Sequence, residues 1–146
     1  TYHNPLFPTV LDIIGLTVWL IGFLFEVVGD KQLASFLSNP LNKGKIMDRG
    51  LWSLTRHPNY FGEITMWWGI WLISVASFAP WWSIISPLTI TILITKVSGI
   101  PMTEKRYLGN TMYDEYKKNV SALVPLHYGK KLFGNYKKYY QTNNEI

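Results

Sequence analysis

The sequence predicts an all-α, polytopic membrane helix bundle with about three transmembrane helices and one cytosolic amphipathic helix. Of its 146 residues, 48% are hydrophobic and only 16% are charged. The apolar residues are gathered into three long runs, and nearly all Lys and Arg lie between or after these runs. Buried helices of a soluble domain are the alternative, but a domain of this size could not cover three such helices. We therefore expect lipid to surround the helices.

Each of the three runs approaches the roughly 20 residues that a helix needs to cross a bilayer. The runs span residues 10–28, 64–78 and 82–100. The first is interrupted only by Asp12 and Glu26 near its ends, the second has no charge, and the third carries only Lys96. The second is short and is expected to end among the aromatic side chains of Trp81 and Trp82, as interfacial belts do.

The positive charges predict an orientation. Five of the fourteen Lys and Arg lie between the first two runs and eight follow the third, whereas Lys96 can reach the same side through its long side chain. Positive charge stays in the cytosol, so the N-terminus is expected outside and the loop and tail inside. The membrane would be the endoplasmic reticulum in a eukaryote or the inner membrane in a bacterium. Topology and an anionic ligand account for the charge, and nucleic acid need not be invoked.

Three parts are expected along the chain. An N-terminal stub at residues 1–8 precedes a membrane-embedded domain at 9–126, and a basic, Tyr-rich cytosolic tail follows at 127–146. The stub has no signal-peptide pattern, and we expect earlier spans to precede this sequence. Without Cys there is neither a disulfide framework nor thiol chemistry.

The loop after the first run is expected to open at Gly29-Asp30 and to turn at Asn39-Pro40 and at residues 42–44. It closes on GLWSLTRHPNYFGE, residues 50–63.

Pro58 suits the first position of the next helix, which stacks Asn59 and Glu63 on one face. Arg56 and His57 precede that helix, and a cation and a His beside a helix start favour an anion site.

Carboxylates at membrane depth are rare and usually functional. Glu26 and Asp30 are four residues apart near the end of the first run, and Glu63 lies just inside the second. The alternative is a structural role, in which these acids pair with Lys31, Lys45 or Arg56. For Asp30 both interpretations stay open, and for Glu63 we favour function.

A helix break and restart is predicted at residues 101–103, and a new amphipathic helix is expected to open at residues 104–106. Tyr113 and Tyr116 are three residues apart on it and share a face. Such tyrosines ordinarily anchor a helix at the membrane interface. No His or Cys stands at metal-ligand spacing and no Walker sequence occurs, so we predict neither a metal site nor a nucleotide loop of soluble type.

Residues 30–125 resemble the C-terminal domain of steroid 5α-reductase-like membrane proteins, and most closely their reductase-like branch. The resemblance is carried by GLWSLTRHPNYFGEITMWWGIWL, by SPL at residues 86–88, by SGIP followed by Glu104, and by YDEYKKNVSALVP. Sterol C14-reductases and isoprenylcysteine carboxyl methyltransferases share the shorter elements.

The resemblance implies a cytosol-facing cavity that holds NADPH. The residues that it implies as cofactor contacts are Asp30, Asn59 and Glu63 as hydrogen-bonding groups, Lys45, Arg56 and Arg106 at the phosphates, Tyr60, Tyr113 and Tyr116 as pocket walls, and His57 and Glu104 beside them. The groups that polarise the substrate carbonyl belong to earlier helices in that family, so no catalytic residue is assigned here.

The leading prediction is a membrane-bound NADPH-dependent reductase of a carbon–carbon double bond in a steroid-like or other hydrophobic lipid. Lys and Arg suit a cofactor with phosphates, and S-adenosylmethionine has none. Glu26 stands where 5α-reductases tend to have an amide and Arg106 falls in a stretch that is His-rich there, which widens the expected substrate beyond steroids. One alternative is an S-adenosylmethionine-dependent methyltransferase of isoprenylcysteine or phospholipid type. Another is a non-catalytic membrane or partner-binding module.

Overall fold

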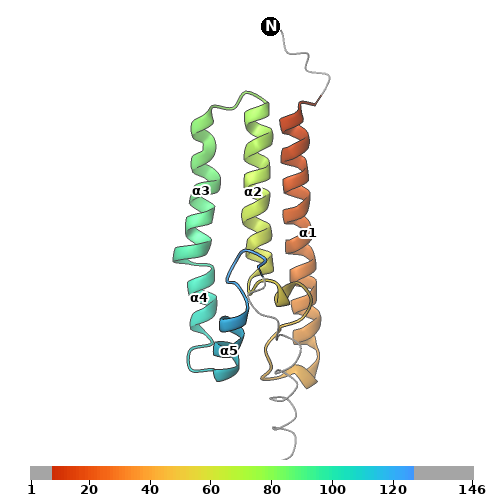
Figure 1. The fold of residues 1–146 in the computed structure, drawn as a ribbon, viewed down its shortest axis with the longest axis vertical. Coiled ribbons are helices and arrows are strands. Elements are labelled where there is room, and N and C mark those ends of the chain that lie inside the picture. The colour runs from red at the N-terminus through yellow and green to blue at the C-terminus, as the bar shows by residue number, and fades with distance from the viewer. Residues whose placement is uncertain (1–7, 127–146) are drawn as a thin grey trace, which may run out of the picture.

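The computed structural model describes residues 8–126, whose regular secondary structure is helical, with no strand and one isolated β-bridge. Its helices are α1 (Val10–Ser38), α2 (Pro58–Ala76), α3 (Ile85–Ile92), α4 (Ile100–Lys105) and α5 (Thr111–Asn119). Single 3-10 turns lie at Pro40–Asn42, Gly50–Ser53 and Trp81–Ile84, and the π-helical turn Leu93–Val97 joins α3 to α4. Figure 1 shows α1, α2 and the α3–α4 stack side by side, with α5 at one end, which we call the α5 end.

The all-α membrane bundle predicted from the sequence is confirmed. Within residues 8–126, the helical stretches Val10–Ser38 and Trp81–Lys105 are long and apolar enough to cross a membrane. α2 lies between them and contains the second apolar run (Figure 1). Large apolar side chains of both stretches are exposed, among them Leu24 at 58% and Ile85 at 66%, which is the surface that lipid covers in a membrane protein.

α1 is ten residues longer than its apolar run. The expected loop opening at Gly29-Asp30 is wrong, because both residues lie inside the helix and the loop begins only at Asn39. Gly29 packs against the start of α2, where a Cβ on it would lie 3.2 Å from a ring carbon of Pro58. The expected turn at Asn39-Pro40 is confirmed, since the Asn39 side chain accepts from the backbone N–H of Leu41 at 3.0 Å.

Glycines spaced by seven residues hold α1 and α2 together. Gly15, Gly22 and Gly29 recur after two helical turns, so they share one face of α1, and all three are buried. A Cβ on Gly22 would lie 2.6 Å from the carbonyl oxygen of Gly62, and one on Gly69 would lie 2.6 Å from the backbone nitrogen of Trp19. The two backbones are therefore in direct contact, as in the small-residue interfaces of membrane helices.

The amphipathic helix begins later than expected. α5 starts at Thr111, where the Asn110 side chain accepts from the backbone N–H groups of Met112 and Tyr113 at 3.0 and 3.1 Å. The expected opening at residues 104–106 is wrong, because Glu104 belongs to the last turn of α4. A turn through Gly109, whose φ is +82°, reverses the chain between the two helices. Glu104 and α5 therefore face each other across a turn.

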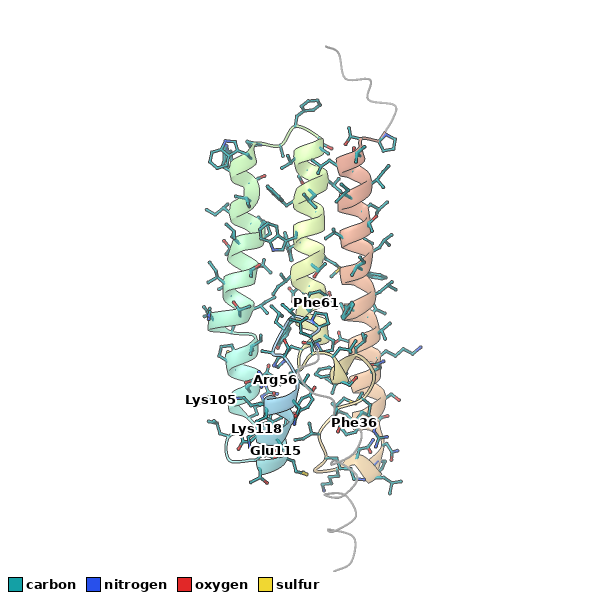
Figure 2. All side chains as sticks on the ribbon, in the orientation of Figure 1. Phe36, Arg56, Phe61, Lys105, Glu115 and Lys118 are labelled. Atoms are coloured by element: carbon teal, nitrogen blue, oxygen red, sulfur yellow. The ribbon has the colours of Figure 1, made fainter. Side chains whose placement is uncertain are left out.

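A small core closes the α5 end of the bundle. It consists of Ile46 from the loop and Tyr113, Tyr116 and Val120 from α5 and its end. The prediction that Tyr113 and Tyr116 share a face is confirmed, and both are buried. Figure 2 shows Arg56 close to this core, beside α5.

Candidate functional site

The candidate site lies where the start of α2, the end of α4 and α5 meet. The segment that follows α5 fixes Thr55 and Arg56, which precede α2. Thr55 forms a parallel β-bridge with Ser121, and the Arg56 N–H donates to the Ser121 carbonyl at 2.9 Å. Pro58 then opens α2 as its first residue, as predicted. This crossing of two distant segments holds Arg56 and His57 in the interior, where they are 9% and 3% exposed.

Glu104 is the centre of the polar network. Its Oε1 lies 3.3 Å from Nη2 of Arg56 and 3.2 Å from Nε2 of His57, and it accepts from the Tyr113 hydroxyl at 3.3 Å. Its Oε2 lies 3.2 Å from the ammonium nitrogen of Lys117. One carboxylate from α4 thus joins the start of α2 to two turns of α5.

Burial sets the protonation of the groups around Glu104. It lowers the pKa of His57, an effect that the Glu104 carboxylate opposes and the Arg56 guanidinium reinforces. The imidazole is therefore neutral at pH 7 and its Nε2–H can donate to Glu104. Burial and the same carboxylate raise the pKa of Tyr113, so its phenol remains protonated. The site combines two basic side chains, Arg56 and Lys117, with two neutral hydrogen-bond donors.

A partly open cavity of about 90 Å³ adjoins this network. Its polar lining comes from Lys45, Arg56, His57, Thr103, Tyr107, Tyr113 and Tyr116, and its apolar lining includes Leu33, Phe36, Ile46 and Trp52. Nε and Nη1 of Arg56 are buried and have no hydrogen-bond partner among the described residues. Buried guanidinium N–H groups without acceptors are costly, so Arg56 is the least satisfied polar side chain of this network.

Hydrogen bonds and stacking fix the walls of the cavity. The Tyr116 hydroxyl donates to the Trp52 carbonyl, and the Trp52 indole donates to the Gly29 carbonyl at 3.0 Å. Tyr60 stacks on the His57 ring, with centroids 5.2 Å apart, and its hydroxyl pairs with Thr103 Oγ1 at 2.9 Å. α1, α2, α4 and α5 are thereby tied together around one small space.

The structure divides the residues expected from the sequence into two groups. Those gathered at the cavity and its network are Lys45, Arg56, His57, Tyr60, Glu104, Tyr113 and Tyr116. Those placed elsewhere are Asp30, Asn59, Glu63 and Arg106.

The second group lies on two other surfaces. Asn59 and Glu63 are on α2 beside α1, where the Glu26 carboxylate is within electrostatic reach of Glu63 and Asp30. Within the described residues neither Asp30 nor Glu63 forms an ion pair, so the structural pairing considered for them is not seen. Arg106 is exposed at the end of α4.

Sequence reasoning missed Lys117 and Thr103. Lys117 follows Tyr113 by four residues and so lies on the same face of α5. That spacing could have identified it. Thr103 had no comparable signal, because its partner Tyr60 is 43 residues away in the sequence. Residues 8–126 contain no group of three or more His, Cys, Asp or Glu side chains that could hold a metal ion.

His57 should make stability depend on pH. Its folded-state pKa is depressed, so the stabilisation from burying it neutral is present above its unfolded pKa of about 6.5 and is lost as pH falls below that value. We expect the thermal midpoint in detergent to be level from pH 7 to 8 and to decline towards pH 5. His57→Gln is the control and should flatten this decline. The same decline in both proteins would contradict the assignment.

Comparisons with known proteins agree with a membrane enzyme family. The sequence matches the family DUF1295, described as a protein of unknown function, over residues 1–120. The probable O-methyltransferase ustE of Ustilaginoidea virens is 39% identical over 67 residues, which is 46% of this chain and 22% of that protein. The match thus spans about a fifth of the relative's length. No solved structure matches the chain.

Proposed function

The chain belongs to the DUF1295 family, and we propose that it holds the cofactor of an NADPH-dependent lipid reductase. One observation carries this proposal. The guanidinium of Arg56 is buried with two N–H-bearing nitrogens unpaired, at a cavity that Lys45 and His57 also line. This donor set suits a phosphate, because charge-assisted hydrogen bonds from Arg to phosphate are strong and directional.

The size of the cavity limits what it can take. Pockets that enclose whole small molecules measure about 300–1,000 Å³. A cavity of about 90 Å³ suits one phosphate group of a dinucleotide and leaves the remainder outside it. S-adenosylmethionine has no phosphate and could offer Arg56 only its single amino-acid carboxylate.

Each residue of the network has a role in this proposal. Arg56 would donate to phosphate oxygens, and Glu104 holds its guanidinium in place through Nη2. His57 and Tyr113 donate to Glu104 and so hold its carboxylate beside Arg56. When bound, NADPH would supply a hydride, and the protein supplies orientation and electrostatics.

The substrate in this proposal is a hydrophobic lipid that reaches the site from the membrane. The carbonyl next to its reacting double bond needs a hydrogen-bond donor as negative charge develops, and the resemblance assigns that donor to other helices. We also propose a multi-pass topology with the α5 end in the cytosol, since the Lys and Arg of residues 31–56 and 105–118 lie at that end.

A methyltransferase is the second candidate. It is favoured by the identity shared with ustE, whose name describes a probable O-methyltransferase. The two candidates differ in the ligand that fills the site. Isothermal titration of the full chain in detergent with NADPH and with S-adenosylmethionine should show binding of NADPH. Binding of S-adenosylmethionine alone would overturn the reductase proposal.

Replacing Arg56 by glutamine should weaken NADPH binding by about tenfold or more, because a charged donor to the phosphate is lost. NADH, which lacks one phosphate, should lose less if Arg56 binds that phosphate. The measurement is titration of both cofactors, with Lys105→Gln as an exposed cationic control that should bind normally. Equal losses for the two cofactors would remove this role from Arg56, and a thermal scan confirms that the variant is folded.

A further inference from the structure

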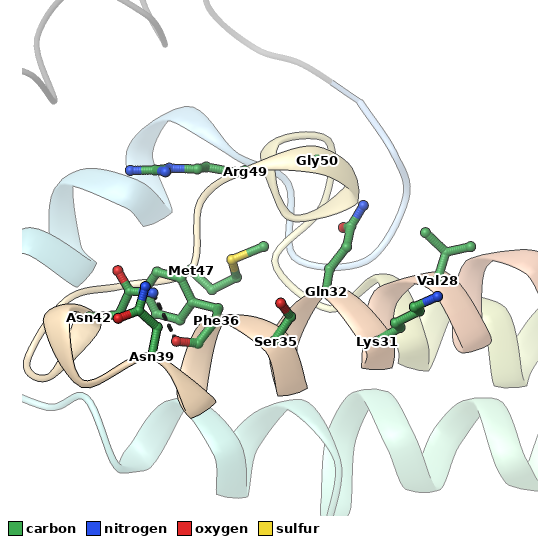
Figure 3. Close-up of a pocket in the computed structure, with 10 residues that line it drawn as sticks. All are labelled: Val28, Lys31, Gln32, Ser35, Phe36, Asn39, Asn42, Met47, Arg49 and Gly50. Carbon is green, nitrogen blue, oxygen red and sulfur yellow. Dashed lines mark hydrogen bonds between the residues drawn. The ribbon is translucent and has the colours of Figure 1, made fainter.

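A second hollow, of about 490 Å³, lies on the other side of the loop from the cavity beside Arg56. That first cavity is called the cofactor cavity, after the proposed function. It is a groove between the last turns of α1 and the loop at residues 39–50 (Figure 3). Its lining residues are Val28, Lys31, Gln32, Ser35, Phe36, Asn39, Asn42, Met47, Arg49 and Gly50. Phe36 and Met47 also line the cofactor cavity, so they form the partition between the two spaces.

The α1 wall of the groove changes from apolar to polar along one helix face. Val28, Lys31, Ser35 and Asn39 are separated by three or four residues and therefore form a single stripe. One helical turn before Val28, Leu24 continues this stripe. Leu24 is 58% exposed and lies on the apolar part of the helix. The groove thus begins on a lipid-facing surface and ends among cationic and amide side chains.

Side-chain hydrogen bonds hold the opposite wall in place. The Gln32 carbonyl oxygen accepts from the Leu51 N–H at 3.0 Å, and the Asn42 amide donates to the Phe36 carbonyl at 2.9 Å. Figure 3 shows Gln32 reaching towards the turn at Gly50. The loop is therefore fastened to α1 on both sides of the groove.

Two basic side chains, Lys31 and Arg49, line the groove. Lys31 forms no ion pair within the described residues, and the nearest contact of Arg49 to an acid is 4.0 Å, from its Nε to Asp48. The Arg49 side chain is 76% exposed. Asp30 is adjacent to Lys31 in sequence, but one residue turns the helix by about 100°, so it lies off the stripe.

We propose that this groove binds a glycerophospholipid with an anionic headgroup. Lys31 would bind the lipid phosphate, Arg49 would attract the anionic headgroup from the other end of the groove, and the amides of Gln32, Asn39 and Asn42 would bond the polar headgroup. Its acyl chains would follow Val28 and Leu24 into the membrane. A free phosphate would use the cations but leave the apolar part of the groove empty, which is why a lipid is the occupant that matches the whole surface.

The test measures binding of phosphatidylglycerol to the full chain in detergent by native mass spectrometry, with phosphatidylcholine as the comparison lipid. Ser35→Trp fills the groove and leaves its charge unchanged, whereas Lys31→Gln with Arg49→Gln removes the charge and leaves its shape. Both variants should bind phosphatidylglycerol about tenfold more weakly or worse. The matched controls are Ser38→Trp and Lys43→Gln with Lys105→Gln, which are exposed, do not line the groove and should bind as the parent does.

Each other outcome overturns the proposal. If Lys43→Gln with Lys105→Gln weakened phosphatidylglycerol binding as much as the groove variants, the lipid would be attracted to the basic surface in general. If Ser35→Trp bound the lipid as the parent does, the lipid would lie outside the groove. Displacement of the lipid by glycerol 3-phosphate at equal affinity would indicate a simple phosphate site. Displacement by NADPH would assign the groove to the cofactor, and equal binding of phosphatidylcholine would remove the anionic preference. A thermal scan of every variant confirms folding, and NADPH titration separates this result from the proposed function.

Discussion

Replacing Glu104 by glutamine is expected to destabilise the α5 end of the bundle more than any other single change to a polar side chain there. Glu104 pairs with Arg56, His57 and Lys117, and its side chain is only 14% exposed. Removing one partner of a buried ion pair leaves an uncompensated charge, which costs about 3–5 kcal/mol. In this case the unpaired charge is the Arg56 guanidinium, two of whose nitrogens already lack a partner.

The measurement is thermal unfolding of the purified protein in detergent, with NADPH titration of the material that stays folded. Glu115→Gln is the control, because within residues 8–126 the ion pair of Glu115 is with Lys118 on the same exposed helix surface, and its loss should cost about 0.5 kcal/mol or less. NADPH affinity should fall with Glu104→Gln, since Arg56 loses the group that orients it. Equal stability of the Glu104 and Glu115 variants would show that the network is not a stabilising element.

Replacing Gly22 by valine should separate α1 from α2. Its Cβ would lie 2.6 Å from both the Gly62 carbonyl oxygen and the backbone nitrogen of Met66. Backbone atoms cannot rotate away as a side chain can, so the helices must move apart. Overpacking costs about 1–3 kcal/mol where side chains can adjust, and we expect the upper end of this range or more here.

Ala34→Val is the matched control, because Ala34 lies on the same helix and is exposed. It should leave the thermal midpoint close to that of the parent. Gly62→Val should reproduce the effect of Gly22→Val, since a Cβ on Gly62 would lie 2.5 Å from the Gly22 carbonyl. A normal midpoint for either glycine variant would contradict the close helix contact.

The apolar runs and one proline were enough to predict most of the fold. Lipid-facing helices need long apolar stretches, and Pro58 stands at the start of α2 as its geometry favours. The end of α1 could not be predicted in the same way, because residues 31–38 are too polar to extend the apolar run and yet remain helical. The apolar and charged pattern places the start of α5 too early, at residues 104–106, because the signal that fixes the true start is the Asn110 cap.

The site could be predicted only in part. Arg56 and His57 stand next to a helix start, which is a local signal that a sequence shows directly. Their contacts with Glu104 join residues 47 positions apart, and no local pattern gives such a distance. The resemblance implied eleven cofactor contacts without dividing them. Only the three-dimensional arrangement separates the residues at the cavity from Asn59 and Glu63 at the α1–α2 contact.

The bridge between Thr55 and Ser121 has a consequence for the order in which the molecule is assembled. During synthesis the residues before α2 leave the ribosome long before Ser121. The hydrogen bond from the Arg56 backbone N–H to the Ser121 carbonyl can therefore form only after α5 has been synthesised. Both long apolar stretches, Val10–Ser38 and Trp81–Lys105, leave the ribosome before α5, since α5 follows them in the chain. A nascent chain halted before residue 111 would therefore contain both apolar stretches but lack Tyr113 and Tyr116, which line the cavity.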